Sequence, residues 1–120
     1  LYRPENLQEK FVYVGAALRT ATEPDALVVT VEHDDGGANS AMLLYFAHRQ
    51  GWSFDVRSMS AGLVPHLAAR GARYFVTTNW RELEAQKPEV AARLLGCCKE
   101  IVLTDVPSGV RLFDLSAAGQ

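Results

Sequence analysis

Runs of β-branched and aromatic residues constrain the fold of this chain more than any other sequence feature. They cover residues 26–31, 73–78 and 101–104, and none of them alternates strictly between apolar and polar positions. Such runs are typical of strands that are buried on both faces of a parallel sheet. The sequence therefore predicts three adjacent central strands that run mutually parallel.

Segments with helical periodicity separate these runs. In residues 4–20 the apolar side chains recur at spacings of four, three and four and so share one helix face. Further helices are predicted over residues 41–50, from Val64, from Trp80 and from Pro88. Because strands that alternate with helices form parallel βαβ units with right-handed crossovers, we expect helices on both faces of the sheet.

Residues with capping and stop preferences mark the ends of two predicted helices. Asn39 or Ser40 is placed to cap the helix over 41–50, and Gly51 is placed to end it in the left-handed conformation. Asn79 is expected to cap the helix that begins at Trp80.

The remaining strands are predicted at the edges of the sheet. Residues 52–56 alternate between apolar and polar, as an edge strand with one solvated face does. Residues 110–115 alternate after a turn and predict an antiparallel closing hairpin with the run at 101–104. The predicted fold class is α/β: a three-layer α/β/α sandwich, Rossmann-like or flavodoxin-like, with a mostly parallel sheet of about five strands.

Length and charge limit the organisation and the partners. The 120 residues suffice for a single domain, with an N-terminal helix and linker (1–25), a βα core (26–115) and a tail expected to fray (116–120). Lys and Arg total 12 against 14 for Asp and Glu, and this near-balance argues against nucleic-acid binding. The first residue is not Met, so we expect the chain to be part of a longer protein.

Cys97 and Cys98 are adjacent. A disulfide between neighbouring residues closes only a strained ring, so the pair does not predict a stabilising disulfide framework. We expect one or both residues to pack near a helix end as small apolar side chains, with a redox or metal-binding role as the alternative.

The polar loop after the first predicted strand is the strongest candidate for a binding site. It comprises residues 33–40 and lies at the carboxyl end of a strand, where open α/β sheets hold their ligands. Asp34, Asp35 and Asn39 offer oxygen atoms to a sugar hydroxyl or a divalent cation. Trp52, placed at the end of an element, joins them as an aromatic residue that can line a groove. A solvated loop with a helix cap is the alternative.

Motifs for catalysis and cofactor binding are missing from the sequence. It has neither the glycine spacing of a dinucleotide-binding loop nor the Lys-Ser/Thr pair of a phosphate-binding loop. It also lacks the Gly-x-Ser-x-Gly turn of serine hydrolases. We therefore predict no catalytic residue, no cofactor and no bound metal.

Three segments resemble one family of proteins. Residues 43–52 are similar to a segment of the type LYYAHRKGW, residues 71–76 to a GAKYFV strand, and residues 110–115 to a closing strand. The segments resemble the soluble C-terminal domain that follows the last membrane span of polytopic glycosyltransferases using lipid-phosphate sugars. That group includes dolichyl-phosphate-mannose–protein mannosyltransferase-like and lipid A aminoarabinose transferase-like proteins. The resemblance extends from about residue 28 to residue 115, in order and with similar spacing.

The resemblance implies a non-catalytic domain on the extracytoplasmic face of a membrane glycosyltransferase, either periplasmic or extracellular. Its partner would be the membrane-embedded remainder of the parent chain, and it would help to position an acceptor or a lipid-linked sugar donor. In this family the catalytic acid lies in a loop of the membrane part, so the resemblance assigns a catalytic role to no residue of this chain. An independent small-molecule-binding or regulatory α/β domain is the alternative, and a stand-alone enzyme is a third hypothesis.

Overall fold

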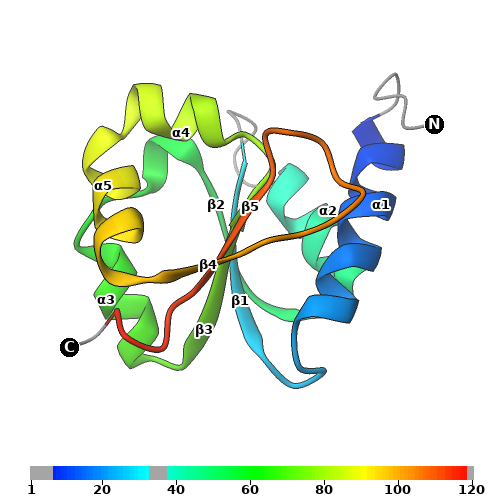
Figure 1. The fold of residues 1–120 in the computed structure, drawn as a ribbon, viewed down its shortest axis with the longest axis horizontal. Helices are drawn as coiled ribbons and strands as arrows, with labels where there is room; N and C mark the ends of the chain where they lie inside the picture. Colours follow the sequence, from blue (N-terminus) through cyan, green and yellow to red (C-terminus); the bar gives the residue numbers. More distant parts are fainter. Residues whose placement is uncertain (1–6, 33–37, 119–120) are drawn as a thin grey trace.

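The computed structural model describes residues 7–32 and 38–118. Within them the chain forms an α/β domain around a five-stranded mixed sheet with the strand order β2-β1-β3-β5-β4 (Figure 1). The elements in chain order are α1 (Leu7–Ala21), β1 (Leu27–Glu32), α2 (Ala38–Ala47), β2 (Gln50–Asp55), the 3₁₀ helix η1 (Val56–Ser58), α3 (Leu63–Ala69), β3 (Ala72–Thr77), α4 (Trp80–Gln86), α5 (Pro88–Cys97), β4 (Lys99–Ile101) and β5 (Arg111–Asp114).

The first three strands form the parallel core of the sheet. β1 pairs in parallel with β2 on one side and with β3 on the other. The prediction of adjacent parallel strands over the first two β-branched runs is therefore confirmed. β2 lies at an edge of the sheet, as its alternating sequence predicts.

The prediction of a third central strand over 101–104 is wrong. β4 ends at Ile101 and lies at the far edge, where it pairs antiparallel with β5. β5 lies between β3 and β4 and runs antiparallel to both. Leu112 and Phe113 of β5 are fully buried on opposite faces of the sheet, whereas Val102 is 85% exposed. The hairpin itself is confirmed, but β5 takes the inner position because it buries apolar side chains on both faces.

Helices cover both faces of the sheet (Figure 1). α1 and α2 pack on one face, on a cluster that includes Phe11 and the β1 residue Val28. We call this the α1–α2 face. α3, α4 and α5 pack on the opposite face, on a cluster that includes Trp80 and the β1 residue Val29. We call this the α3–α5 face. Neighbouring residues of β1 therefore support different layers of helices, as the alternation of side chains along a strand requires.

The connection between α2 and β2 is tighter than predicted, because α2 already ends at Ala47. His48 takes the left-handed conformation, with a φ of 54°. Nη2 of Arg49 donates hydrogen bonds to the carbonyl oxygens of Arg19, at 3.1 Å, and of Thr22, at 2.9 Å. Arg49 thereby satisfies carbonyl groups at the C-terminal end of α1 that have no partner within that helix.

Gly51 lies within β2 and not at a helix end, so the prediction that it terminates α2 is wrong. Its φ is +152°, and a Cβ atom at this position would lie 1.8 Å from the carbonyl oxygen of Val28. The close approach of β2 to β1 therefore requires glycine here. The predicted N-cap is also displaced, because α2 begins at Ala38 and Asn39 and Ser40 lie within its first turn.

The C-terminal segment is packed rather than frayed. Ala118 is 2% exposed and contacts the cluster of the α3–α5 face, and its N–H donates to the carbonyl oxygen of Leu115 at 2.9 Å. The predicted fraying is therefore wrong for residues 116–118. In the part of the chain that the structure describes, no helix has the length and hydropathy needed to cross a membrane.

Candidate functional site

The order of the strands reverses at β1. The chain leaves β1 through α2 toward β2 on one side, whereas β3 pairs on the other side of β1. α2 and α4, the helices that follow β1 and β3, pack on opposite faces of the sheet. In open α/β sheets, ligands bind at such a point, outside the carboxyl ends of the strands. The carboxyl ends of β1 and β3 are therefore the candidate site.

Glu32, the last residue of β1, is a fully buried acidic residue at this point. Its Oε2 accepts a hydrogen bond from the backbone N–H of Thr78 at 2.7 Å. Its Oε1 accepts hydrogen bonds from the Thr78 hydroxyl and, at 2.7 Å, from Nδ2 of Asn79. The carboxyl group of Glu32 thus joins the end of β1 to the connection between β3 and α4.

Asn79 precedes α4 but does not cap it with its side chain. α4 begins at Trp80 as predicted, and the backbone N–H of Trp80 donates to the carbonyl oxygen of Gly109 at 3.0 Å. Asn79 occupies the N-cap position, but its side-chain oxygen accepts no hydrogen bond from α4, so the prediction of a side-chain cap is wrong. Nδ2 of its amide group instead donates to the buried carboxyl group of Glu32, a bond that is charge-assisted when this group is ionised.

Burial determines the proton affinity of Glu32. Removal from water raises the pKa of its carboxyl group to about 7, although the hydrogen bonds from Thr78 and Asn79 and the positive charge of Lys10 favour the ionised form. Lys10 lies on α1 and is itself half-buried, and its burial lowers the pKa of the ammonium group. Glu32 therefore exchanges a proton near neutral pH, where an ordinary glutamate is ionised.

A second buried carboxylate ends the neighbouring strand β2. Asp55 is 7% exposed and is paired in register with Glu32. Oδ1 of Asp55 accepts hydrogen bonds from the N–H of Ser58 at 3.0 Å and from its hydroxyl at 3.1 Å. Nη2 of Arg57 lies 4.0 Å from Oδ2. Because these contacts cap the 3₁₀ helix that follows, Asp55 has a local structural role.

The site residues predicted from sequence have different outcomes. Asp34 and Asp35 lie outside the described residues, and of Asn39 the structure describes only its place in the first turn of α2. Trp52 lies in the middle of β2, in register with Val29, and its half-buried side chain packs on the cluster of the α3–α5 face. It is not at an element end, and about 10 Å of strand separates its register position from the carboxyl end of β1. Ligand binding by Asp34, Asp35, Asn39 and Trp52 stays a prediction.

The cluster of Glu32, Thr78 and Asn79 was not predicted from the sequence. The available signal is that two buried-strand runs end in polar residues, and that the carboxyl ends of adjacent parallel strands meet at one edge of the sheet. The predicted first strand ends at residue 31 and the predicted loop begins at residue 33, so Glu32 belongs to neither prediction.

Other parts of the described structure are weaker candidates. A hollow of about 400 Å³ lies between α1 and residues 102–105, but its lining is mainly alanine, threonine and aliphatic side chains. Ligand sites usually combine an apolar cavity with a few converging polar groups. The polar residues of this lining, Tyr13, Thr20, Thr104 and Asp105, are all exposed to solvent. Among residues 7–32 and 38–118, no group of three His, Cys, Asp or Glu side chains is placed to bind a metal ion.

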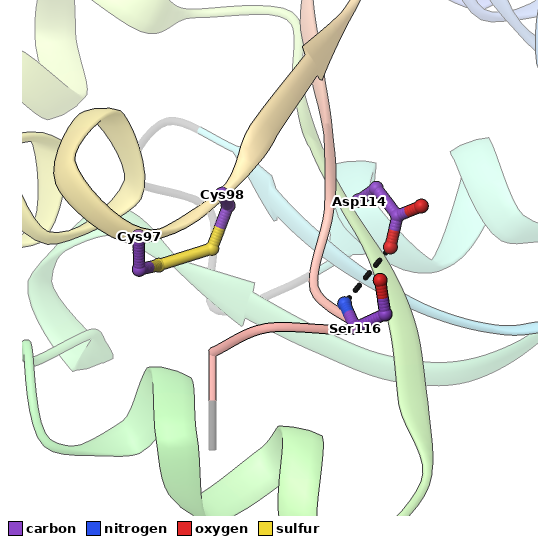
Figure 2. Close-up of a disulfide and its surroundings, with 4 residues drawn as sticks. All are labelled: Cys97, Cys98, Asp114 and Ser116. Atoms are coloured by element: carbon purple, nitrogen blue, oxygen red, sulfur yellow. Dashed lines mark hydrogen bonds between the residues drawn. A yellow bond between two sulfur atoms is a disulfide. The ribbon is translucent and has the colours of Figure 1, made fainter. Parts of the chain in front are cut away.

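Cys97 and Cys98 form a disulfide at the junction of α5 and β4 (Figure 2). Both residues are half-buried and pack on the cluster of the α3–α5 face. The predicted place near a helix end is confirmed, whereas the expectation of two unlinked apolar side chains is wrong.

The candidate site is thus defined by the burial and hydrogen bonding of Glu32, Thr78 and Asn79. Comparisons with protein-family models, curated proteins and solved structures give no match for this chain. The interpretation of the site therefore rests on its chemistry. A carboxyl group with a pKa near neutral pH lies at the carboxyl ends of the adjacent strands β1 and β3.

Proposed function

We propose that this chain is a non-catalytic extracytoplasmic domain of a membrane glycosyltransferase, and that it positions an acceptor or a lipid-linked sugar donor. The main support is the place in the fold of the three segments that resemble this family. They occupy the α2–β2 unit (43–52), β3 (71–76) and β5 (110–115). The resemblance therefore covers strands throughout the sheet and not a single local motif.

The distinctive residues of these segments have structural roles. Arg49 binds carbonyl groups at the end of α1, and Gly51 allows the backbone of β2 to approach Val28. Sequence that specifies architecture in this way supports a common fold without supporting a common catalytic residue. This is the reason for proposing a positioning role for the domain, with the membrane-embedded remainder of the parent chain as its partner.

The disulfide between Cys97 and Cys98 supports the extracytoplasmic part of the proposal. Disulfides persist in oxidising surroundings such as the periplasm and the cell exterior, and they are rare in the cytosol of most organisms. In an extracytoplasmic domain the oxidised form of this pair would be the resting form, and a dithiol reductant would be needed to open it.

We also propose that the fold is a three-layer α/β/α sandwich of the Rossmann-like, flavodoxin-like kind. Support comes from the helices on both faces of the sheet and from the reversal of strand order at β1. In such folds the reversal is where ligands bind.

An independent small-molecule-binding domain is the second candidate function. The buried cluster of Glu32, Thr78 and Asn79 favours it, because a hydrogen-bonded carboxyl group at a ligand-binding position can couple ligand binding to a proton. This candidate needs neither a membrane part nor a lipid-linked sugar.

Amide NMR of the labelled chain tests both candidates. The probes are a polyprenyl-phosphate mannose in detergent micelles, mannose 1-phosphate and free mannose. The glycosyltransferase proposal predicts that the lipid-linked sugar shifts the amides of Thr78 and Asn79, and that no sugar is transferred. Shifts with only the water-soluble probes favour the independent binding domain. Sugar turnover above a buffer blank contradicts the non-catalytic role, and an unchanged spectrum with all three probes contradicts the binding of a mannosyl donor under either candidate.

The same titration tests the ligand site that the sequence predicts. Asp35→Ala should abolish the shifts while changing the free energy of unfolding by no more than about 0.5 kcal/mol, as is usual for a substitution in a solvated loop such as the sequence predicts here. Unchanged shifts in this variant would remove Asp35 from the site.

A further inference from the structure

The disulfide between Cys97 and Cys98 has no role in the proposed function, apart from the surroundings that it indicates. It joins neighbouring residues, with Cα atoms 3.8 Å apart, at the junction of α5 and β4 (Figure 2). We propose that this pair is a reversible redox-modification site that accepts two electrons from a dithiol, either a small molecule or a protein. In this proposal the redox state of the pair controls how firmly β4 is held on the sheet.

This disulfide is poorly suited to act as a permanent cross-link. The stabilisation that a disulfide gives by constraining the unfolded chain grows with the loop that it closes, and here no residue lies between the cysteines. Disulfides usually join Cα atoms that are about 4.4–6.8 Å apart, farther than adjacent residues can reach. Disulfides that join Cα atoms outside this range are more easily reduced than ordinary structural disulfides, and they are typically regulatory or catalytic.

The surroundings of the pair leave it accessible to a reductant. Cys97 and Cys98 are half-buried, and the flanking residues Gly96 and Lys99 are exposed. A Cβ atom added to Gly96 would have no neighbouring atom within 4 Å, so the space beside the pair is open. The positive charge of Lys99 favours the approach of a thiolate, which is the attacking species in thiol–disulfide exchange.

The reaction is an ordinary exchange with balanced electrons. A thiolate of the dithiol attacks one sulfur atom, the bond between the two cysteine sulfurs breaks, and a mixed disulfide forms. The second thiol of the reductant then attacks the mixed disulfide and closes its own disulfide. Two electrons and two protons have passed to the protein, which now carries two thiols. An oxidised dithiol compound reverses the reaction.

The junction transmits this change to the sheet because no loop separates α5 from β4. The N–H of Cys98 donates to the carbonyl oxygen of Leu94 at 3.1 Å, and the backbone of Cys98 is already extended. One residue thus ends the helix and leads directly into the strand. The ring of the disulfide restricts rotation of both cysteines, and reduction removes that restriction.

β4 is the shortest strand of the sheet. Besides its pairing with β5, Oε1 of Glu100 lies 3.4 Å from Nη1 of Arg111, and Ile101 packs on the cluster of the α1–α2 face. β4 has three residues, Lys99 and Glu100 are exposed, and β5 is its partner strand at the edge of the sheet. Short edge strands with few buried contacts open with a small free-energy cost. Release of the junction is therefore expected to loosen β4 before any other strand.

The partner strand β5 is held independently of the disulfide. Oδ1 of Asp114, its last residue, accepts hydrogen bonds from the N–H of Ser116 at 2.8 Å and from Nε of Arg73 at 3.2 Å (Figure 2 shows the first). Phe113 and Leu112 are fully buried. Reduction is therefore expected to change β4 and to leave β5 in place.

Mass spectrometry of the whole chain tests the redox step. Trypsin cleaves after Arg93 and after Lys99, so both cysteines lie on one peptide. The chain is equilibrated in buffers of graded ratio of reduced to oxidised dithiothreitol, which is a small dithiol, and is then alkylated and digested. We expect this peptide to convert reversibly between two forms. The oxidised form is lighter by two hydrogen atoms than the peptide with two thiols, and the reduced form carries two alkyl groups. A peptide that keeps one form over the whole range, or a disulfide that links two chains, would overturn the proposal.

Hydrogen exchange tests the structural consequence. In the reduced chain the amides of β4 that are hydrogen-bonded to β5 should exchange about tenfold faster or more, with β1 and β3 unchanged. The double variant Cys97→Ser/Cys98→Ser cannot close the ring, so it should exchange like the reduced chain in both buffers. Equal exchange rates of the β4 amides in the oxidised and the reduced chain would overturn the proposal that the redox state governs how firmly β4 is held. Faster exchange throughout the sheet would instead indicate a structural cross-link and overturn the switch.

Discussion

At the residue scale, Gly51 has the least room for a side chain among the glycines that the structure describes. Gly51→Ala would place a Cβ atom 1.8 Å from the carbonyl oxygen of Val28, at a φ of +152°. Because backbone and not a flexible side chain occupies that space, we expect a loss of about 3 kcal/mol or more in the free energy of unfolding, measured by urea denaturation.

Gly96→Ala is the matched control for this substitution. Gly96 lies in α5, and a Cβ atom there would meet nothing within 4 Å. Alanine is favoured over glycine in a helix, so this variant should gain up to about 1 kcal/mol. A Gly51→Ala variant as stable as the parent chain would show that β2 does not approach β1 this closely.

The carboxyl group of Glu32 makes stability depend on pH. Its pKa is about 7 in the folded protein, against an ordinary value of 4.5. Between these two pH values the folded state binds more protons than the unfolded state, so the free energy of unfolding decreases as pH rises through this window. One pKa unit corresponds to about 1.4 kcal/mol, so the full decrease is on the order of 3 kcal/mol.

Urea denaturation between pH 4 and pH 8 measures this effect, with Glu32→Gln as the comparison. Glutamine has nearly the same size and cannot ionise. The difference in unfolding free energy between the two proteins at each pH therefore separates the titration of Glu32 from that of the histidines and of Lys10. We expect the parent chain to lose stability relative to Glu32→Gln as pH rises through the window. Parallel pH profiles would rule out a raised pKa at Glu32.

At the scale of elements, Arg49 fastens the end of α1 to the end of α2. Its guanidinium group donates to the Thr22 hydroxyl at 3.0 Å and, from Nη1, to the carbonyl oxygen of His48 at 3.1 Å, besides the bonds to the α1 carbonyl groups. A planar guanidinium can serve these acceptors together, whereas an ammonium group cannot. Arg49→Lys should therefore cost about 1–3 kcal/mol of unfolding free energy.

Arg81→Lys is the control for this prediction, because Arg81 is an exposed residue of α4. It should change the unfolding free energy by no more than about 0.5 kcal/mol in the same denaturation experiment. Equal stabilities of the Arg49→Lys and Arg81→Lys variants would mean that the hydrogen bonds of Arg49 add nothing in solution.

At the scale of the whole molecule, one sheet supports both layers of helices, so we expect them to unfold together. Trp52 and Trp80 both pack on the α3–α5 face, whereas Leu43 is fully buried on the α1–α2 face. Leu43→Ala should cost about 2–5 kcal/mol and should lower the midpoints of tryptophan fluorescence and of far-UV circular dichroism equally. Leu95→Ala, at a 53% exposed position, should change both midpoints little.

Different unfolding midpoints by tryptophan fluorescence and by circular dichroism would contradict this prediction. If Leu43→Ala lowers the midpoint of circular dichroism and leaves the fluorescence midpoint unchanged, the two faces unfold independently. The sheet would then transmit no stabilisation from one layer of helices to the other.

Local patterns in the sequence determined most of the secondary structure. The β-branched run in β1 and the helical spacing of Phe11, Val14 and Leu18 each identify an element correctly. Propensity and periodicity are properties of short segments, so they are visible before any tertiary contact is known. The general position of a site, at the carboxyl end of the first strand, follows from the same patterns together with the rule for open sheets.

Tertiary structure alone decided which strands are neighbours and which polar groups meet. The run at 101–104 has the composition of a central strand, yet β5 occupies the inner position because Leu112 and Phe113 fill both faces there. Glu32 accepts hydrogen bonds from Thr78 and Asn79 only because β1 and β3 are adjacent. Such contacts join residues far apart in the chain, and their free energy depends on the packing of the whole molecule, which no local pattern contains.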